Sequence, residues 1–410
     1  MIMPDAGRSE RKQVLFLHPN FPAQFKHLAN AAAAAGLETG FVCQTHYGRK
    51  LPGVKILTLK GKCGIDHLNE VAKNQLQRTS TLSDQYRHGL IKLKSAGWQP
   101  DVVISHSGWG CGLHVRELWP NCRHVAYVEW WFNPQSDFFL YDPENDELNL
   151  SSKQAPKTWL RNQAQALELV HADAIVAPTR WQAQQLPPLL KERCFVIHDG
   201  IDLDRFKPKP ELRNKVSPLL TYGTRGMEPI RAFPQFIRSL PALLHQHQDV
   251  RVEIAGEDSI NYGGNKPEQH PTWGCWAKEF LGKQGLEGRV SWLNYLNSSD
   301  YVAWLQRSSC HVYLTHPFVA SWSLLEALAC QCPMVVSDVK PVREICEATS
   351  AEVAYVDHRN IPSLSATIGR CLTGSHEMDP RVDRRIKIYS KEAALMEWSH
   401  VACLELTTNH

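Results

Sequence analysis

Short, uninterrupted apolar segments alternate with helix-length segments along the chain, and this pattern restricts the fold more than any other feature of the sequence. An uninterrupted apolar run indicates a strand buried on both faces, as in parallel sheets that are covered by helices. The first series of runs comprises residues 14–18, 39–43, 54–59, 101–106, 124–130, 174–178 and 194–200, and the second comprises 219–224, 251–256, 289–293, 310–315, 333–338 and 352–357. Two such series predict two doubly wound α/β domains in tandem.

A polar, proline-containing stretch, DLDRFKPKPELRNKVSP, separates the two series. We expect an N-terminal domain in residues 1–205, a linker in 206–218, a second domain in 219–385 and a closing helix within 386–410. Ligands of such sheets bind beyond the carboxyl ends of the strands. Functional residues are therefore expected directly after strands, facing a cleft between the two domains.

Composition narrows the class of protein. The 410 residues are too many for one ordinary core, and a net charge of +3 argues against dedicated nucleic-acid binding. No segment approaches the roughly 20 apolar residues of a transmembrane helix, and the N-terminal MIMPDAGRSERKQ lacks the apolar core of a secretory signal. The twelve cysteines form no CxxC pair, so we expect reduced thiols in a cytoplasmic protein. A zinc site or a disulfide framework is the alternative.

The loop after the first strand of the second series carries two arginines in the sequence YGTRGMEPIRAFPQF, residues 222–236. Arg225 and Arg231 would stand where a cleft opens. Two guanidinium groups there suit a di- or triphosphate, because each can donate two hydrogen bonds to phosphate oxygens. The alternative is that both are solvated surface charges.

The stretch HPFVASWSLLEALACQCPMVVSD, residues 316–338, predicts a helix followed by a buried strand. The helix begins near Ser321, a good N-cap residue, and its free backbone N–H groups and positive dipole end suit an anion. Glu326 interrupts the apolar run, and burying an unpaired carboxylate costs several kcal/mol. Two hydroxyl groups of a ribose beside the phosphate would pair with it. A buried ion pair with Lys or Arg is the alternative.

Two strand ends of the first series carry polar and aromatic candidates. His106 ends the strand DVVISH and precedes the glycine-containing SGWGCGL, which favours a ligand contact over a purely structural histidine. Glu129 and Trp130 lie in VEWWFNP at the end of the next strand, where aromatic rings would stack on the apolar face of a sugar while Glu129 accepts hydrogen bonds from its hydroxyls. Packing between domains is the alternative for these aromatic residues.

A basic segment suggests a further partner. Residues 49–98 hold ten Lys or Arg against three Asp or Glu, together with Trp98. Such a face suits anionic lipid or a lipid-linked acceptor, and peripheral membrane contact is one expectation. A solvated helix face is the alternative.

Six segments resemble, in this order, the motifs of glycosyltransferase family 4: HPNFPAQFKHLA, APTRWQAQQL, VIHDGIDLDRFKP, YGTRGMEP, IAGED and LLEALACQCPMVVSD. The resemblance runs from about residue 13 to 405. Members of the family are retaining, nucleotide-sugar-dependent enzymes with the GT-B fold. The VIHDGIDLDRFKP segment is similar to the family's inter-domain strand and turn, although the family usually has Asn where this chain has Asp199. The closing helix would be the family's crossover helix, which packs back against the N-terminal domain.

The resemblance implies roles for individual residues. Arg225 and Arg231 would neutralise the departing nucleoside diphosphate, and His106 would contact the donor sugar. The implied donor-binding residues are Asn294 and Tyr295 for the base, Glu326 for the ribose hydroxyls, and the backbone N–H groups of Ala320, Ser321, Trp322, Ser323 and Leu324 for the diphosphate.

The chain departs from the family pattern at two places. Phe318 stands where the E-x7-E signature has its first glutamate, a donor-sugar ligand in relatives, and Glu326 is the second. By its position in this signature, Phe318 is still expected among the donor-binding residues. The segment PNFPAQF, residues 19–25, replaces the usual glycine pair, so Asn20 and Gln24 would supply side-chain donors in the N-terminal domain.

These observations lead to a functional expectation. We expect a cytoplasmic, retaining glycosyltransferase that moves a sugar from a UDP- or GDP-linked donor to the hydroxyl of a glycan, lipid or small metabolite, without a metal or other cofactor. One alternative is a nucleotide-sugar 2-epimerase of the same fold. Another is a catalytically inactive protein that binds nucleotide sugars, an alternative that the loss of the glutamate at Phe318 favours.

Overall fold

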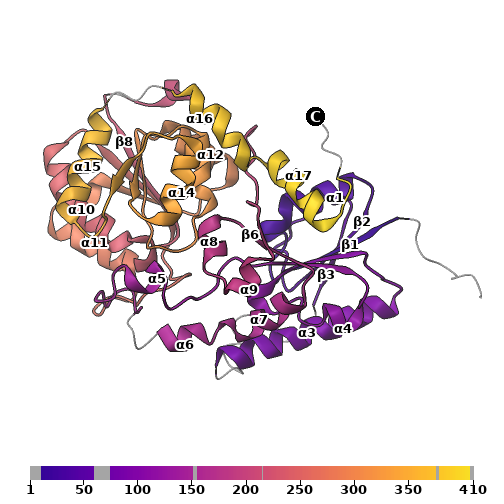
Figure 1. Cartoon of the computed structure of the whole chain (residues 1–410). Helices are drawn as coiled ribbons and strands as arrows, with labels where there is room; N and C mark the ends of the chain where they lie inside the picture. The colour runs from indigo at the N-terminus through magenta and orange to yellow at the C-terminus, as the bar shows by residue number, and fades with distance from the viewer. Residues whose placement is uncertain (1–10, 60–73, 151–154, 215, 375–377, 407–410) are drawn as a thin grey trace, which may run out of the picture. The chain divides into compact units, whose positions relative to one another are not determined.

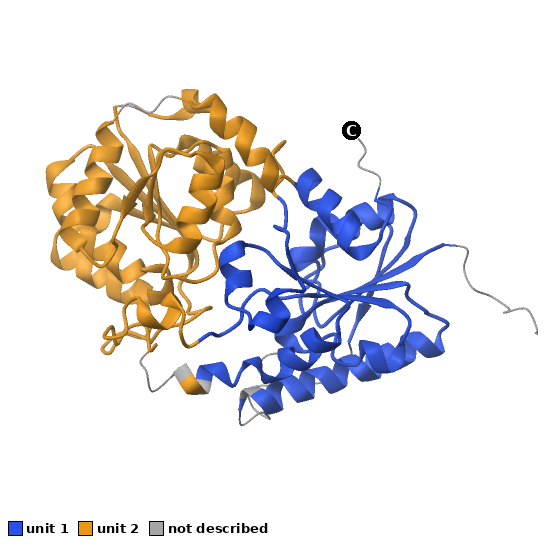
Figure 2. Ribbon diagram, viewed as in Figure 1, with its two compact units in different colours: residues 1–133, 157–200, 391–410 blue, residues 134–156, 201–390 orange. Residues whose placement is uncertain are grey.

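The computed structural model describes residues 11–59, 74–150, 155–214, 216–374 and 378–406. The chain divides into two compact units (Figure 2). Unit 1 comprises residues 1–133, 157–200 and 391–410, and unit 2 comprises residues 134–156 and 201–390. Each unit contains one parallel sheet, as the two series of apolar runs predict.

The sheet of unit 1 has the order β3-β2-β1-β4-β5-β6-β7, which is that of a doubly wound fold. Its strands are β1 (Gln13–Leu17), β2 (Glu38–Cys43), β3 (Val54–Thr58), β4 (Val102–His106), β5 (Arg123–Tyr127), β6 (Ala174–Ala177) and β7 (Cys194–Val196). The uninterrupted apolar runs arise because both faces are covered. In β1, Val14 and Phe16 belong to one buried cluster, and Leu15 and Leu17 belong to another on the opposite face.

The helices of unit 1 cover both faces of this sheet (Figure 1). They are α1 (Lys26–Ala34), α3 (Gln75–Ser95), α4 (Val115–Leu118), α7 (Asn162–His171), α8 (Arg180–Gln184), α9 (Pro188–Lys191) and α17 (Lys391–Ala402); α6 (Ala155–Trp159) begins in unit 2 and ends in unit 1. The C-terminal helix α17 packs against α1, with Trp398 and Val401 in the buried cluster of that face. The backbone carbonyl of Val401 accepts a hydrogen bond from Arg123 Nε at 2.7 Å.

The sheet of unit 2 has the order β10-β9-β8-β11-β12-β13. Its strands are β8 (Leu219–Gly226), β9 (Arg251–Glu257), β10 (Val290–Asn294), β11 (Cys310–Tyr313), β12 (Met334–Ser337) and β13 (Ala354–Val356). Its helices are α5 (Asp137–Leu140), α10 (Phe233–Gln246), α11 (Trp273–Lys283), α12 (Ser298–Arg307), α13 (Trp322–Ala329), α14 (Lys340–Thr349), α15 (Ile361–Thr373) and α16 (Pro380–Arg385). Within the described ranges, no helix has the length and apolarity needed to span a membrane.

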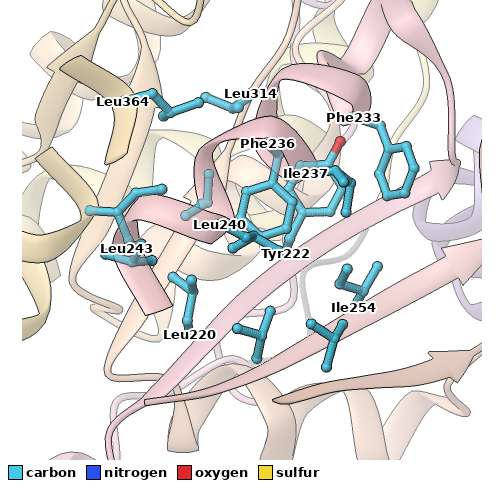
Figure 3. Close-up of a cluster of buried hydrophobic side chains, with 14 of the residues drawn as sticks. Leu220, Tyr222, Phe233, Phe236, Ile237, Leu240, Leu243, Ile254, Leu314 and Leu364 are labelled. Carbon is cyan, nitrogen blue, oxygen red and sulfur yellow. The ribbon is translucent and has the colours of Figure 1, made fainter. Parts of the chain in front are cut away.

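Helix α10 forms the centre of one core layer in unit 2. Tyr222 of β8 stacks on Phe236 of α10, with ring centroids 4.5 Å apart and planes 14° apart. Figure 3 shows Leu220 and Ile254, from β8 and β9, in the same cluster as Leu243 of α10. Burying each side chain of this size contributes roughly 1.5–3 kcal/mol, so packing against α10 helps to hold β8 in place.

One segment lies in a different unit from the one its sequence position suggests. Residues 134–156, expected in the N-terminal domain, pack within unit 2. Phe138 is buried there, and its backbone carbonyl accepts a hydrogen bond from His316 Nε2 at 2.7 Å. The carboxylate of Glu147 forms an ion pair with Arg238 of α10. These contacts join the segment to elements far along the chain, which local sequence patterns cannot indicate.

Candidate functional site

The two arginines of the candidate phosphate site have different surroundings. Arg225 lies within β8, near its carboxyl end, and is exposed to solvent. Arg231 ends the short 3-10 turn that follows β8 and is only 5% exposed. Its Nη1 donates hydrogen bonds to Thr315 Oγ1 at 2.8 Å and to the backbone carbonyl of Val319 at 3.1 Å. The alternative that both arginines are solvated surface charges is therefore wrong for Arg231.

Aromatic rings surround the buried cation. The guanidinium carbon of Arg231 lies 4.9 Å from the ring centroid of Tyr262 and 5.8 Å from that of Phe318. Phe318 also packs against Phe138, with centroids 5.4 Å apart. A cation over the face of an aromatic ring is attracted by the quadrupole of the ring. The structure thus places Phe318, at the position of the family's glutamate, in the aromatic surroundings of Arg231.

A buried glutamate that the sequence analysis missed holds this arrangement. Glu228 is fully buried, and its Oε2 accepts hydrogen bonds from the backbone N–H groups of Asn261 and Tyr262, both at 2.8 Å, and of Gly263 at 3.1 Å. Desolvation raises the pKa of Glu228. By fixing the loop after β9, Glu228 keeps the Tyr262 ring over Arg231. In the sequence, the position of Glu228 shortly after a buried strand could have indicated this role.

Helix α13 begins where the sequence predicts, with Ser321 at the N-cap position. The Ser321 hydroxyl does not cap the helix, since it bonds Ser323 Oγ at 2.6 Å and the Tyr313 hydroxyl at 3.2 Å. Two backbone N–H groups of the predicted phosphate set already have partners. That of Ser321 donates to the Tyr313 hydroxyl, and that of Leu324 to the Ser321 carbonyl. Leu324 is buried in the core, and Trp322 is exposed.

Glu326 of α13 has a phenolic partner. The hydroxyl of Tyr301 on α12 donates to Glu326 Oε2 at 3.0 Å. Burial, together with the carboxylate, raises the pKa of Tyr301 well above its usual value, so the phenol stays protonated and donates. Glu326 is half-buried, so its carboxylate is not sealed from solvent.

The residues expected near the base lie at the carboxyl end of β10. Asn294 is exposed and has a φ of 52°, at an irregularity in the pairing of β10 with β9. Tyr295 follows and is 74% exposed. Two strands, β9 and β8, separate β10 from β11, so at about 4.8 Å per strand these residues lie on the order of 14 Å across the sheet from the strand before α13.

In unit 1, His106 is brought together with a second histidine. His106 ends β4, is buried, and places Nε2 3.3 Å from Glu129 Oε2. The ring of His18, which follows β1, meets the ring of His106 edge-on, with centroids 4.9 Å apart. Burial and the neighbouring His106 hold the pKa of His18 well below its usual range, so His18 is neutral. A strand-terminal histidine is the same signal that selected His106, and the sequence analysis passed over it.

Asn20 and Gln24 support this pair. The Asn20 backbone N–H donates to His18 Nδ1 at 2.9 Å, and the Gln24 side chain also hydrogen-bonds His18. Trp130 is buried, and its backbone carbonyl accepts a hydrogen bond from Gln165 at 3.1 Å. Of the two N-domain candidates after β5, Glu129 is therefore the more accessible, and the Trp130 ring is occupied by packing.

Two family models match the chain. The model for the glycosyl transferase family 4 group matches residues 35–206, and that for glycosyl transferases group 1 matches residues 218–374. The chain belongs to glycosyltransferase family 4. A search of curated proteins finds no significant match to this glycosyltransferase.

Solved structures share the fold of this glycosyltransferase. Sucrose-phosphate synthase from Thermosynechococcus elongatus is 17% identical, with a TM-score of 0.66 over 96% of this chain and 97% of the other. HepE from Anabaena, in complex with UDP and glucose, is 13% identical, with a TM-score of 0.65 over 95% of this chain and 99% of the other. The predicted α/β fold of GT-B type is confirmed.

The predicted basic face is only partly within the described residues, because residues 60–73 lie outside them. Lys55 pairs with Glu38 at 2.6 Å, and Arg87 pairs with Glu117. These lysine and arginine charges are partly neutralised by neighbouring carboxylates. Within the described part of the chain, no group of three or more His, Cys, Asp or Glu side chains is arranged to hold a metal ion.

A buried polar network lies directly beside His106 in this glycosyltransferase. Ser105 Oγ donates to Glu168 Oε1 at 2.6 Å and accepts from His124 Nε2 at 2.7 Å. The backbone N–H of Gly112 donates to Glu168 Oε2 at 3.1 Å. Desolvation raises the pKa of Glu168 to about 7 and lowers the pKa of His124 to about 3.

The raised pKa of Glu168 predicts a pH-dependent stability. Because the folded pKa of about 7 exceeds the ordinary 4.5, the native state binds an extra proton between these values, so stability falls as pH rises from about 4.5 to about 7 and then levels off. Glu168→Gln mimics the protonated acid and removes this titration. The difference in free energy of unfolding, variant minus wild type, is expected to be about 2 kcal/mol larger at about pH 8.5 than at about pH 5.5. Urea denaturation at both pH values measures it; an equal difference at both would contradict the prediction.

Proposed function

We propose that the protein is a retaining glycosyltransferase that uses a UDP- or GDP-linked sugar and needs no metal. The proposal is supported by the order of elements within unit 2, where β8 neighbours β11, the strand that precedes α13. Arg225 lies near the carboxyl end of β8, and Arg231, in the turn after β8, donates to the Val319 carbonyl shortly before α13, the helix that carries Glu326. Cations and a helix N-terminus suit a diphosphate, and a carboxylate suits ribose hydroxyls. The likeness to HepE, which was solved with UDP, supports a nucleotide ligand.

The proposed reaction follows from where charge develops. As the bond between the anomeric carbon and the β-phosphate oxygen breaks, its electron pair leaves with the nucleoside diphosphate and the sugar becomes an oxocarbenium-like cation. The guanidinium groups of Arg225 and Arg231 and the dipole of α13 stabilise the departing negative charge. The acceptor hydroxyl then attacks the anomeric carbon from the face that the diphosphate leaves, and its proton passes to the leaving phosphate oxygen. Attack on this face retains the anomeric configuration. Fixed cations take the role that Mg²⁺ has in other phosphate sites.

Two residues of unit 1 are assigned to sugar hydroxyls. His106, held between Glu129 and the neutral His18, is assigned to hydroxyls of the transferred sugar. Glu129 is assigned to hydrogen bonds from the acceptor. A carboxylate at position 129 and an imidazole at position 106 offer both acceptors and a donor, which is what sugar hydroxyls require.

A second candidate function, a nucleotide-sugar-binding protein without catalysis, is favoured by one observation. Phe318 replaces a carboxylate, and its ring packs against Phe138 and Arg231, so a ligand of donor-sugar hydroxyls is missing at this position. With Phe318 in place of the glutamate, the protein would still bind the nucleotide, because Arg225 and Glu326 are present.

The decisive experiment is a panel of UDP- and GDP-sugars incubated with the protein without acceptor, with released UDP or GDP as the readout. Slow hydrolysis of one donor, unaffected by EDTA, is the expected result. Calorimetry with UDP and GDP is run in parallel. Tight nucleotide binding without hydrolysis, and without transfer to any acceptor tested, favours the binding protein. If neither nucleotide binds, both candidates are wrong.

A further inference from the structure

Helix α7 buries three polar side chains beside the apolar Ala164 and Leu169, and it exposes two large apolar ones, which is unusual for a surface helix. Asn162, Gln165 and Glu168, spaced three residues apart, are all buried. Leu167 and Val170, on the same helix, are 56% and 52% exposed. Burying an amide or a carboxylate is unfavourable unless hydrogen bonds replace those of water. The buried polar stripe therefore needs partners, and these partners are the loops that follow two strands of the sheet.

The C-terminal member of the stripe holds the loop after β4. Glu168 accepts hydrogen bonds from Ser105 Oγ at 2.6 Å and from the Gly112 backbone N–H at 3.1 Å, which bracket His106 and the turn behind it. The fit at Gly112 is close. A Cβ there would lie 2.4 Å from both Glu168 Oε1 and Ser105 Oγ, so a larger residue would force the carboxylate out of place.

The other two members hold the loop after β5. Asn162 forms two reciprocal hydrogen bonds with the backbone of Phe132. Its side chain donates to the Phe132 carbonyl at 2.8 Å and accepts from the Phe132 N–H at 3.0 Å. Gln165 Nε2 donates to the Trp130 carbonyl at 3.1 Å and to Asn162 Oδ1 at 3.0 Å. Glu129 begins this loop. Three side chains from one helix thus fix the backbone of both loops that bear the candidate sugar-side residues.

We propose that Asn162, Gln165 and Glu168 are positioning residues that set the geometry of the strand end carrying His106 and of the loop carrying Glu129. The inference rests on the proposed function for what His106 and Glu129 contact, but the placement of the loops can be measured independently of activity. The three residues act largely through backbone groups, because they hydrogen-bond the carbonyls of Trp130 and Phe132 and the N–H groups of Gly112 and Phe132.

The test compares Asn162→Ala and the double variant Asn162→Ala/Gln165→Ala with Gln163→Ala, a change at an exposed position of the same helix. Hydrogen exchange followed by mass spectrometry is expected to show at least tenfold faster exchange in peptides covering residues 128–133, with unchanged exchange in α10. Donor hydrolysis or transfer is expected to fall at least tenfold while the Kd for UDP or GDP stays within twofold. Gln163→Ala is expected to match the wild type in every measurement.

Several outcomes are distinguishable. Unchanged exchange in residues 128–133 of a folded double variant, or faster exchange with full activity, would overturn the inference. If the wild type itself turns over no donor, the proposed function fails, and the exchange data alone then decide whether the stripe sets the loop. If the alanine variants do not fold, Asn162→Asp is used. It keeps the acceptor for the Phe132 N–H, loses the donor to the Phe132 carbonyl, and is expected to show the same localised change.

Discussion

Replacing Arg225 by alanine is expected to lower turnover by about 100-fold or more, as the loss of one preorganised donor to a developing oxyanion does in other enzymes. In the proposed reaction, the Arg225 guanidinium is most needed when charge accumulates on the leaving diphosphate. The side chain is exposed, so its removal takes little from the core, and the thermal unfolding midpoint is expected to change little. Initial rates at saturating donor and a thermal melt measure the two effects.

Two further variants sharpen this prediction. Arg225→Lys keeps the charge but not the planar fork, so it is expected to recover only part of the lost rate. Arg251→Ala removes an exposed arginine at the start of the neighbouring strand β9, at the opposite end of the sheet, and is expected to behave as the wild type. Full turnover in Arg225→Ala would end the assignment of this residue to the diphosphate.

Replacing Glu326 by alanine is expected to weaken UDP or GDP binding by at least about 100-fold. Removing a carboxylate that accepts two hydrogen bonds from a ribose lowers the binding free energy by roughly 1.5–3 kcal/mol for each bond. Each 1.4 kcal/mol corresponds to about a tenfold change in affinity. Calorimetry measures the change. The 2′-deoxy nucleotide tests the cause. The wild type is expected to bind it more weakly than the ribonucleotide, whereas Glu326→Ala is expected to bind the two nucleotides equally well.

Tyr301→Phe is the matched control for Glu326. It removes the Tyr301 hydroxyl, which donates to Glu326 Oε2, and leaves the carboxylate itself. Nucleotide affinity is expected to stay within a fewfold of the wild type. If Tyr301→Phe and Glu326→Ala instead destabilise the protein equally, and neither alters nucleotide affinity, Glu326 serves the structure and the ribose assignment is wrong.

The family and the architecture could be predicted from the sequence because both depend on local patterns. Uninterrupted apolar runs require helices on both faces of a sheet, and Val14 and Leu15 do pack in different buried clusters. The start of α13 at Ser321 and the strand end at His106 were predictable within a few positions, although the Ser321 hydroxyl bonds other side chains and does not cap the helix. Six motifs also resemble those of the glycosyltransferase family that the family models identify.

Other features were decided only by the tertiary structure. Arg225 and Arg231 look equivalent in the sequence, yet only Arg231 is buried, because Tyr262 and Phe318 arrive from other loops. Glu228 pairs with backbone groups some 33 residues away, and Asn162 with a loop 30 residues away. Such hydrogen bonds are made to backbone N–H and carbonyl groups, which every residue type offers. The sequence therefore determined which elements form and which family they belong to, and the packing of distant segments determined which polar side chains hold the site.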